Sequence, residues 1–223
     1  MLEVQQLSAW YGAVQALFEV SLTVGAGELV VLQGLNGAGK STLLQSVIGL
    51  GPHTRGSVRY QGQDMAHLPP HARAQRGLGF VPEDRRLFAG LTAQENLLVA
   101  ARLPAAQPGV SQAAQLERVL AMFPPLKALL KRRAAHMSGG EQQMLSIART
   151  LMTAPTMLLL DEPCEGIAPV LVESIRDALL SLKAQGMPML VAEQNALLSD
   201  HADRVITLVA GHISDPSGPH NTP

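Results

Sequence analysis

A glycine-rich segment containing a single lysine is the part of this chain whose residue types and spacing most directly suggest chemistry. It follows the pattern Gly-x-x-x-x-Gly-Lys-Ser, spelled by Gly34, Leu35, Asn36, Gly37, Ala38, Gly39, Lys40 and Ser41. Glycines allow successive backbone N–H groups to turn inward around a phosphate. The Lys40 ammonium can neutralise the outer phosphates, and the Ser41 hydroxyl can bind Mg²⁺. The pattern predicts a nucleoside triphosphate site; the simpler alternative is a glycine-rich turn with an incidental lysine.

The flanking residues place this segment between a strand and a helix. The apolar run 29–32 is rich in β-branched residues and predicts a buried strand. After the lysine, apolar residues recur at helical spacing, at Leu43, Leu44, Val47 and Ile48. A helix that begins near Lys40 would add its positive end to the phosphate-binding backbone.

A second glycine pair opens another predicted helix. Ser138, Gly139, Gly140 and Glu141 precede a helix with Met144, Ile147, Ala148 and Leu151 on one face. Free N–H groups at such a helix start can hold an anion. A plain capped helix is the alternative, although it would need the serine and not two glycines.

Two adjacent carboxylates follow a continuous apolar run. Residues 157–160 are apolar on both faces, as in a central parallel strand, and Asp161 and Glu162 come next. Ligands of parallel sheets gather at the carboxyl ends of the strands, so both acids are expected beside the phosphate-binding loop. One can hold Mg²⁺ while its neighbour faces the attacking water. A purely structural role for both acids is the alternative.

Other polar and aromatic groups leave their roles open. Tyr11, between two predicted strands, could be a stacking face for an adenine ring or a hydrophobic plug. The basic run 131–133 is interpreted as a solvated helix end. None of the seven histidines has metal-ligand spacing with Cys164 or with another histidine, so we do not expect a zinc site.

Composition restricts the class of protein. The 223 residues are 47% hydrophobic and carry a net charge of −1 with 3% aromatics, which does not favour a nucleic-acid partner. A single cysteine excludes an intrachain disulfide. We find neither an export signal nor about 18 uninterrupted apolar residues, and the cytoplasm is the expected compartment.

The chain order predicts an α/β fold. We expect antiparallel strands within 2–24 and an edge strand at 57–60, then a short helix from about 67 to 76 and a core strand at 78–81. Helices over 92–103, 110–123 and 127–133 form a helical insert, about 90–137. A helix at 170–182, a strand at 188–192 and a hairpin over 205–213 follow, and residues 215–223 are expected to be disordered. The prediction is a mostly parallel phosphate-loop NTPase core with flanking helices, an N-terminal antiparallel β subdomain and an inserted helical subdomain.

The order of these motifs resembles the ATP-binding subunit of an ABC transporter, over a single domain at about residues 2–214. Four segments look like the LivF-type ATPases of branched-chain amino-acid importers: VPEDRRLFAGLTAQENL at 81–97, MSGGEQQMLSIARTLM at 137–152, DEPCEGIAP at 161–169 and VAEQNA at 191–196. The ATPases of urea and short-amide importers have similar sequences in these segments.

The resemblance implies roles for matching positions. Tyr11 would stack on adenine, and 34–42, ending in Thr42, would cradle the phosphates with Ser41 on Mg²⁺. Ser138, Gly139 and Gly140 would touch the γ-phosphate of ATP bound to the opposite subunit, and Glu141 would belong to the same nucleotide-binding turn. Asp161 would assist Mg²⁺, and Glu162 would be the general base.

Three positions depart from the general pattern of the family. Glu83 stands where most relatives have a glutamine at the metal, and Ala168 replaces an aspartate. Gln194 stands where many relatives have a switch histidine; it can hydrogen-bond the γ-phosphate but cannot take up a proton at neutral pH. These changes bear on the rate of hydrolysis more than on ATP binding. Cys164 is interpreted as a small filler.

The resemblance implies an ATPase on the inner face of the cell membrane that dimerises head to tail on ATP. Its partners would be a second ATPase subunit, two membrane permease subunits and a solute-binding protein. The alternatives are a urea or short-amide importer, a non-transport ABC ATPase and a metabolic phosphate-loop kinase. The 223 residues leave no room for the coiled-coil insertions or second ATPase half usual in the non-transport class.

Overall fold

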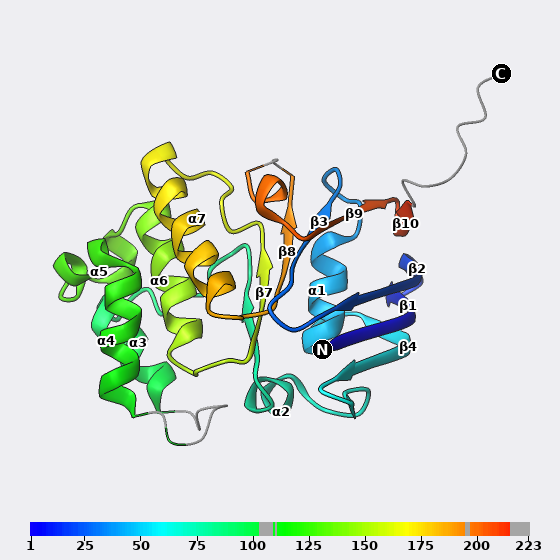
Figure 1. Ribbon diagram of the computed structural model, residues 1–223, viewed down its shortest axis with the longest axis horizontal. Helices are drawn as coiled ribbons and strands as arrows, with labels where there is room; N and C mark the ends of the chain where they lie inside the picture. Colours follow the sequence, from blue (N-terminus) through cyan, green and yellow to red (C-terminus); the bar gives the residue numbers. More distant parts are fainter. Residues whose placement is uncertain (103–108, 110, 195–196, 215–223) are drawn as a thin grey trace.

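The computed structural model describes residues 1–102, 109, 111–194 and 197–214. The tail predicted over 215–223 lies outside the described residues, as does the end of the helix predicted over 92–103. Two sheets with a helix between them and a group of helices on one side make up the molecule (Figure 1).

The first sheet is antiparallel, with strand order β2-β1-β4-β5. It contains β1 (Leu2–Tyr11), β2 (Val14–Val24), β4 (His53–Tyr60) and β5 (Gln63–Asp64). Alternate residues Val20, Leu22 and Val24 are buried and the residues between them are exposed, which is the period-2 pattern of a half-exposed strand. The strand predicted at 57–60 is longer than expected and is not an edge strand, because it pairs with β1 on one side and with β5 on the other.

The second sheet has strand order β10-β9-β3-β8-β7-β6 and is parallel except for β10. Its members are β3 (Leu29–Gln33), β6 (Leu78–Val81), β7 (Met157–Asp161), β8 (Met189–Glu193), β9 (Arg204–Val209) and β10 (His212–Ser214). Every residue of β7 and β8 is buried. Full burial is what a continuous apolar run predicts for a central strand of a parallel sheet. Because β3, β7 and β8 are parallel neighbours, the residues that follow them emerge at one edge of the sheet.

Helices cover both faces of the parallel sheet. Helix α1 (Lys40–Ile48) lies between the two sheets and buries Leu43, Leu44 and Val47 against both of them. Helices α6 (Gly139–Leu151) and α7 (Pro169–Ala184) cover the opposite face, where they share a core with alternate residues of β3, β7 and β8 (Figure 1). The short helix α2 (Pro70–Gln75) precedes β6.

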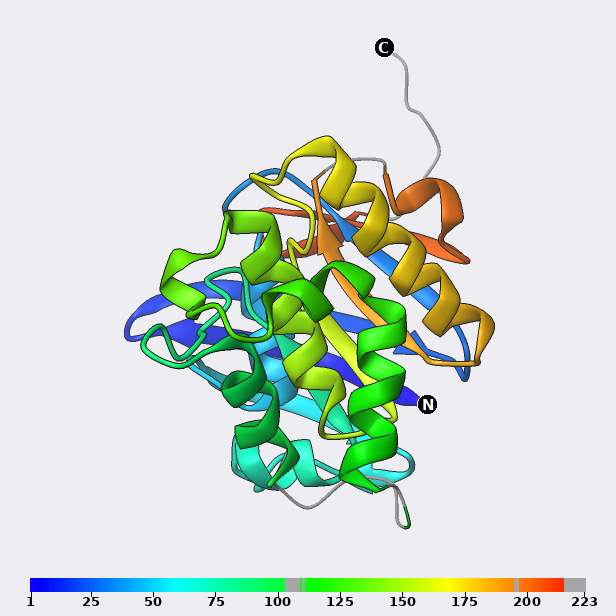
Figure 2. The same ribbon diagram turned by 90° about the vertical axis from the view of Figure 1, so that its left-hand side faces the viewer.

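Three further helices gather on the outer side of α6, opposite the antiparallel sheet (Figure 1, Figure 2). They are α3 (Ala93–Ala101), α4 (Gln112–Met122) and α5 (Pro124–Leu129), and short 3₁₀ turns occur at Ala134–His136 and Ser199–His201. The helix predicted at 127–133 was misplaced: α5 begins at Pro124, because the fixed φ of proline suits the first turn of a helix. Among the described residues, no helix combines the length and apolar character needed to cross a membrane.

Candidate nucleotide site

The predicted phosphate-binding loop connects β3 to α1, and its glycines are required by its shape. Gly37 and Gly39 have φ of +81° and +104°, in the left-handed region that favours glycine. A Cβ at Gly39 would come within 2.8 Å of the Leu17 side chain, and one at Gly34 would clash with the carbonyl oxygen of Leu208. The loop therefore brings its backbone close to the neighbouring strands, which larger residues would prevent.

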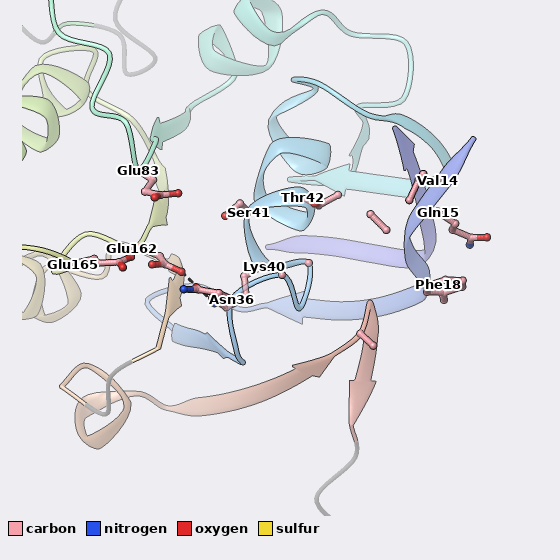
Figure 3. A pocket seen from close by; sticks show the side chains of 14 residues that line it. Val14, Gln15, Phe18, Asn36, Lys40, Ser41, Thr42, Glu83, Glu162 and Glu165 are labelled. Carbon is pink, nitrogen blue, oxygen red and sulfur yellow. Dashed lines mark ion pairs between the residues drawn. The ribbon is translucent and has the colours of Figure 1, made fainter. Parts of the chain in front are cut away.

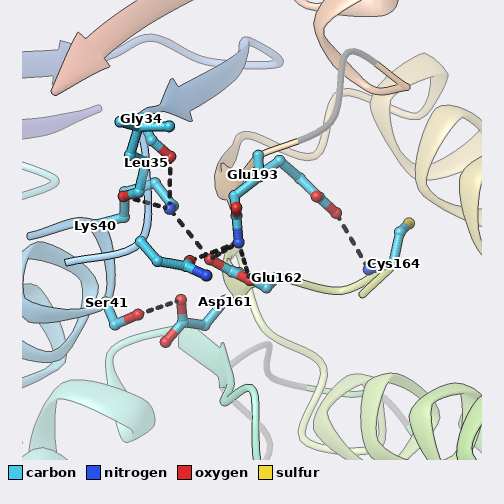
Figure 4. A network of polar contacts seen from close by, with 10 residues as sticks. Gly34, Leu35, Lys40, Ser41, Asp161, Glu162, Cys164 and Glu193 are labelled. Atoms are coloured by element: carbon cyan, nitrogen blue, oxygen red, sulfur yellow. Dashed lines mark hydrogen bonds and ion pairs between the residues drawn. The ribbon is translucent and has the colours of Figure 1, made fainter. Parts of the chain in front are cut away.

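Lys40 is the first residue of α1, and its ammonium group lies inside the loop. Nζ donates to the carbonyl oxygens of Gly34 at 2.8 Å and Leu35 at 3.3 Å (Figure 4). It also forms an ion pair with Oε1 of Glu162 at 3.1 Å, and both side chains are almost fully buried. The sheet thus brings the predicted lysine and the predicted general base into direct contact across more than half of the chain.

Ser41 and Asp161 form the second contact between the loop and β7. The Ser41 hydroxyl donates to Oδ1 of Asp161 at 2.9 Å (Figure 4). Burial raises the pKa of Asp161 to about 6; the Ser41 hydrogen bond opposes this, and the nearby Glu83 and Glu162 carboxylates add to it. Hydroxyl and carboxylate oxygens are ligands that Mg²⁺ prefers. Among the described residues, no group of three or more His, Cys, Asp or Glu side chains could hold a metal ion.

Glu162 follows β7 in a left-handed backbone conformation, with φ of +48°. This conformation is uncommon for a residue other than glycine and persists where surrounding contacts enforce it. The Gln194 amide nitrogen Nε2 donates to the Glu162 carboxylate, at 3.2 Å to Oε2 and 3.4 Å to Oε1. The same nitrogen donates to Oδ1 of Asn36 at 2.6 Å. Gln194 therefore joins the phosphate-binding loop to the candidate base.

A cavity of about 570 Å³ opens over these groups. The carboxylates Glu83, Glu162 and Glu165 lie on one side of it, and residues from β2 lie on the other, with the loop between them (Figure 3). Its volume is in the range of small-molecule and cofactor sites. The loop residues that line it are Asn36, Gly37, Gly39, Lys40, Ser41 and Thr42.

Six of the residues that line the cavity were not predicted from the sequence: Val14, Gln15, Ala16, Phe18, Glu165 and Ala210. Phe18 is the aromatic one among them, and Glu165 the charged one. Phe18 lines the cavity, and its ring stacks on His212 with centroids 4.5 Å apart. Phe18 is in alternation with the buried residues Val20 and Leu22 but is only partly buried. Glu19 between them adopts a positive φ of +48°, and the β1–β2 pairing shifts register nearby. Glu165 lines the acidic side and is exposed. No local sequence signal identifies either residue.

Tyr11 lies at the end of β1 and is not among the cavity-lining residues. The residue is 46% exposed, so it is not buried as the hydrophobic plug considered from the sequence would be. The Tyr11 hydroxyl donates to Oε1 of Gln45 on α1 at 3.0 Å. A half-exposed ring held beside α1 remains available for stacking, and its predicted contact with adenine stays a prediction.

The predicted serine turn begins α6 with a reciprocal cap. The Ser138 hydroxyl accepts the Glu141 N–H at 3.4 Å, and Oε2 of Glu141 accepts the Ser138 N–H at 2.7 Å. A Cβ at Gly140 would clash with Leu171 of α7, so close helix packing requires that glycine. A Cβ at Gly139 would make only ordinary contact, at 3.5 Å from the Arg85 guanidinium. These four residues do not line the cavity formed by the loop of the same chain.

Together, these features define a phosphate-loop α/β nucleotide-binding protein. The model of one family, ABC transporter, matches residues 17–165, and the chain belongs to that family. The family and the cassette fold make the chain a nucleotide-binding protein and an ATP hydrolase.

Curated relatives cover nearly the whole chain. The high-affinity branched-chain amino acid transport ATP-binding protein BraG of Pseudomonas aeruginosa is 42% identical over 96% of this chain and 91% of its own. The probable branched-chain amino acid transport ATP-binding protein LivF of Archaeoglobus fulgidus is 35% identical, over 96% and 90%. The lipopolysaccharide export system ATP-binding protein LptB of Haemophilus influenzae is 32% identical, over 96% and 88%.

Solved structures agree with the fold. A nucleotide-free ATP-binding cassette from an ABC transporter superposes with a TM-score of 0.82 and 27% identity, over 96% of this chain and 90% of the other. A bacterial ABC transporter cassette solved as a dimer superposes with a TM-score of 0.85 and 25% identity, over 96% and 97%. The expected α/β class, with one antiparallel and one mostly parallel sheet, is confirmed.

Proposed function

We propose that this chain is the ATP-binding and ATP-hydrolysing subunit of an importer for branched-chain amino acids. The observation that carries the proposal is its 42% identity, over 96% of its length, to the amino-acid transport protein BraG. The similar LivF protein has the same stated role, and the LptB export protein is less similar. Within the chain, residues 2–214 form a single ATPase domain, with the helical subdomain inserted at about 90–137.

The working form is a head-to-tail dimer, either of two copies or of this chain with a sister ATPase. The 138–141 turn and the phosphate-binding loop do not share a cavity within one chain, which supports a site completed by a second subunit. The reciprocal cap uses Ser138 and Glu141, whereas no contact among the described residues requires a glycine at 139. A solved cassette with the same fold forms a dimer. Ser138, Gly139 and Gly140 of one chain would then contact the γ-phosphate of ATP held by the other.

The loop residues 34–42 hold the triphosphate, and Lys40 neutralises its outer phosphates. Ser41 and Asp161 would hold Mg²⁺, with Glu83 facing the same cavity, and the cation would supply charge neutralisation for phosphoryl transfer. Glu162 accepts the proton of the attacking water, and Gln194 holds the carboxylate in place through its amide. Tyr11 stacks on the adenine ring.

An apolar groove of about 490 Å³ is the proposed contact surface for a membrane permease subunit. It is bounded by α2, β6, α3 and α6, and Phe88 at its edge is half exposed. Arg149 stacks over the Phe88 ring at 5.6 Å and donates to the carbonyl oxygens of Arg85 and Arg86. The loop that carries Glu83 therefore continues into the groove, which supports its use by a cytoplasmic segment of the permease to sense the nucleotide site. In the proposed complex the chain works at the inner face of the cell membrane, with two permease subunits and a solute-binding protein.

Solute uptake tests the proposal. Membrane vesicles are prepared with a candidate permease pair and its solute-binding protein, and uptake of labelled leucine, valine and urea is measured with and without the chain. We expect ATP-dependent leucine and valine uptake with the wild-type chain and none with Glu162→Gln. Uptake of urea in place of leucine would assign the chain to the alternative importer class, and uptake independent of the chain would contradict the proposal.

A further inference from the structure

A third buried carboxyl group, besides those of Asp161 and Glu162, contacts the turn at 162–165 and has no role in the site described above. Glu193 is the last residue of β8, is only 2% exposed, and is not among the residues that line the nucleotide cavity. Its Oε1 accepts the backbone N–H of Cys164 at 3.1 Å (Figure 4). Burial raises the pKa of Glu193 to about 7, and the hydrogen bonds from Cys164 oppose that rise.

Its partner, Cys164, lies in the turn that carries Glu162. The Glu165 N–H donates to the Glu162 carbonyl at 3.3 Å and closes the turn across Pro163, which has no N–H to donate. The Cys164 N–H is not used by that closing bond, and an unpaired N–H at this buried position would be costly. Glu193 provides its acceptor.

Two hydrogen bonds to β8 thus hold Glu162, the residue with the left-handed backbone, from both sides along the chain. The Glu162 N–H donates to the Ala192 carbonyl at 2.9 Å, and the next available N–H, that of Cys164, donates to Glu193. Glu162 lies between these bonds with its φ of +48°. Backbone in this region persists only where neighbouring contacts over-determine it, and these two bonds are such contacts.

We propose that Glu193 is a positioning residue for ATP hydrolysis: its carboxyl oxygen anchors the Cys164 N–H and so holds the Glu162 carboxylate between Lys40 and Gln194. The inference depends on the proposed role of Glu162 as general base. Gln194 follows Glu193 directly in the chain, so one strand end sets both the turn and the amide that contacts the Glu162 carboxylate. Glu193 itself does not contact the reacting groups.

Three substitutions separate anchoring from charge and from packing. Glu193→Gln retains an acceptor oxygen of the same reach but loses the ability to ionise. Glu193→Leu fills similar volume without an acceptor. Cys164→Ala removes the thiol and retains the backbone N–H, so it is the matched control. Glu162→Gln reports on the base itself.

The experiment measures MgATP turnover, KM and nucleotide affinity for the full chain and these variants. Because small misplacements of a catalytic group can cost about a hundredfold, we expect Glu193→Leu to lower kcat about 10- to 100-fold. Nucleotide affinity should change less than about twofold, because the phosphate-binding loop is untouched. Glu193→Gln and Cys164→Ala should remain within about threefold of the wild-type kcat. Rescue by glutamine is a result that general loss of stability would not produce.

Amide hydrogen exchange tests the hydrogen bond between Glu193 and the Cys164 N–H in the wild-type chain, without any substitution. The Cys164 amide of the wild-type chain should exchange as slowly as the Glu162 amide, and faster exchange would contradict the anchor even if Glu193→Leu fails to fold. A folded Glu193→Leu chain with wild-type kcat, or a Glu193→Gln chain as slow as Glu193→Leu, would overturn the proposal. If Glu162→Gln hydrolyses ATP normally, the general base assignment fails instead, which is a distinguishable outcome.

Discussion

Replacing Glu162 by glutamine is the most informative change to this site, because it retains the shape of the side chain and removes its basicity. Gln194 Nε2 lies 3.2 and 3.4 Å from the two carboxylate oxygens, so an amide oxygen can still accept one of these bonds. The glutamine cannot accept a proton from water. A general base contributes about 10²–10⁴-fold, and we therefore expect kcat to fall at least about a hundredfold, or about 2.7 kcal/mol of transition-state stabilisation.

The same substitution should change stability in a way that depends on the nucleotide. It removes the ion pair between Lys40 and Glu162, which are 3.1 Å apart and nearly buried. Breaking a buried pair costs about 3–5 kcal/mol when the remaining charge has no other partner. Lys40 retains two carbonyl acceptors at 2.8 and 3.3 Å, so we expect a smaller loss of unfolding free energy, about 1–3 kcal/mol. The negative charge of a bound triphosphate would neutralise the Lys40 ammonium in place of Glu162. ATP should therefore raise the free energy of unfolding more in Glu162→Gln than in wild type.

Phosphate release, nucleotide titration and thermal unfolding with and without ATP measure these effects, and size-exclusion chromatography with ATP should detect a trapped closed dimer. Glu165→Gln is the matched control: Glu165 lines the same cavity and is exposed, and among the described residues no ion pair involves it. The control should hydrolyse ATP at close to the wild-type rate. Turnover by Glu162→Gln within tenfold of wild type would refute the assignment of Glu162 as the base.

Further predictions concern other parts of the molecule. Gly140→Ala should lower the free energy of unfolding by about 1–3 kcal/mol in urea titrations, because the added methyl group clashes with Leu171. Gly139→Ala should unfold like wild type but impair ATP-dependent dimerisation, and equal stabilities for the two variants would contradict the packing argument. The Glu193 pKa is raised from 4.5 to about 7, so its contribution to stability is present below about pH 4.5 and is lost as pH rises through 7. Relative to wild type, Glu193→Gln should therefore gain up to about 3 kcal/mol between pH 4 and 8, and a difference independent of pH would contradict this. Phe88→Asp should abolish co-purification with the permease while ATP binding is retained; unchanged co-purification would exclude the groove as the docking site.

Patterns within short stretches of sequence were sufficient to predict the glycine-rich loop and the strands that precede the proposed catalytic groups. Gly37 and Gly39 occupy positive-φ positions, a local requirement that their spacing before Lys40 already indicated. The continuous apolar run before Asp161 identified a central parallel strand, and the rule that ligands gather at carboxyl ends placed both acids near the loop. Helix boundaries were less accurate, as at α5, because proline can begin a helix as readily as it separates two.

Contacts between distant residues were decided only by the tertiary structure. Gln194 contacts Asn36 and Glu162, which lie on different elements, and no spacing in the chain indicates that one amide reaches both. The anchor from Glu193 to Cys164 depends on the register between β7 and β8, and the place of Phe18 in the cavity wall depends on a shift in strand pairing. Residue type and local periodicity determine which chemistry a segment can perform and which element it forms. Which side chains meet depends on how parallel strands from separate parts of the chain align, because their side chains approach one another only when the sheet is assembled.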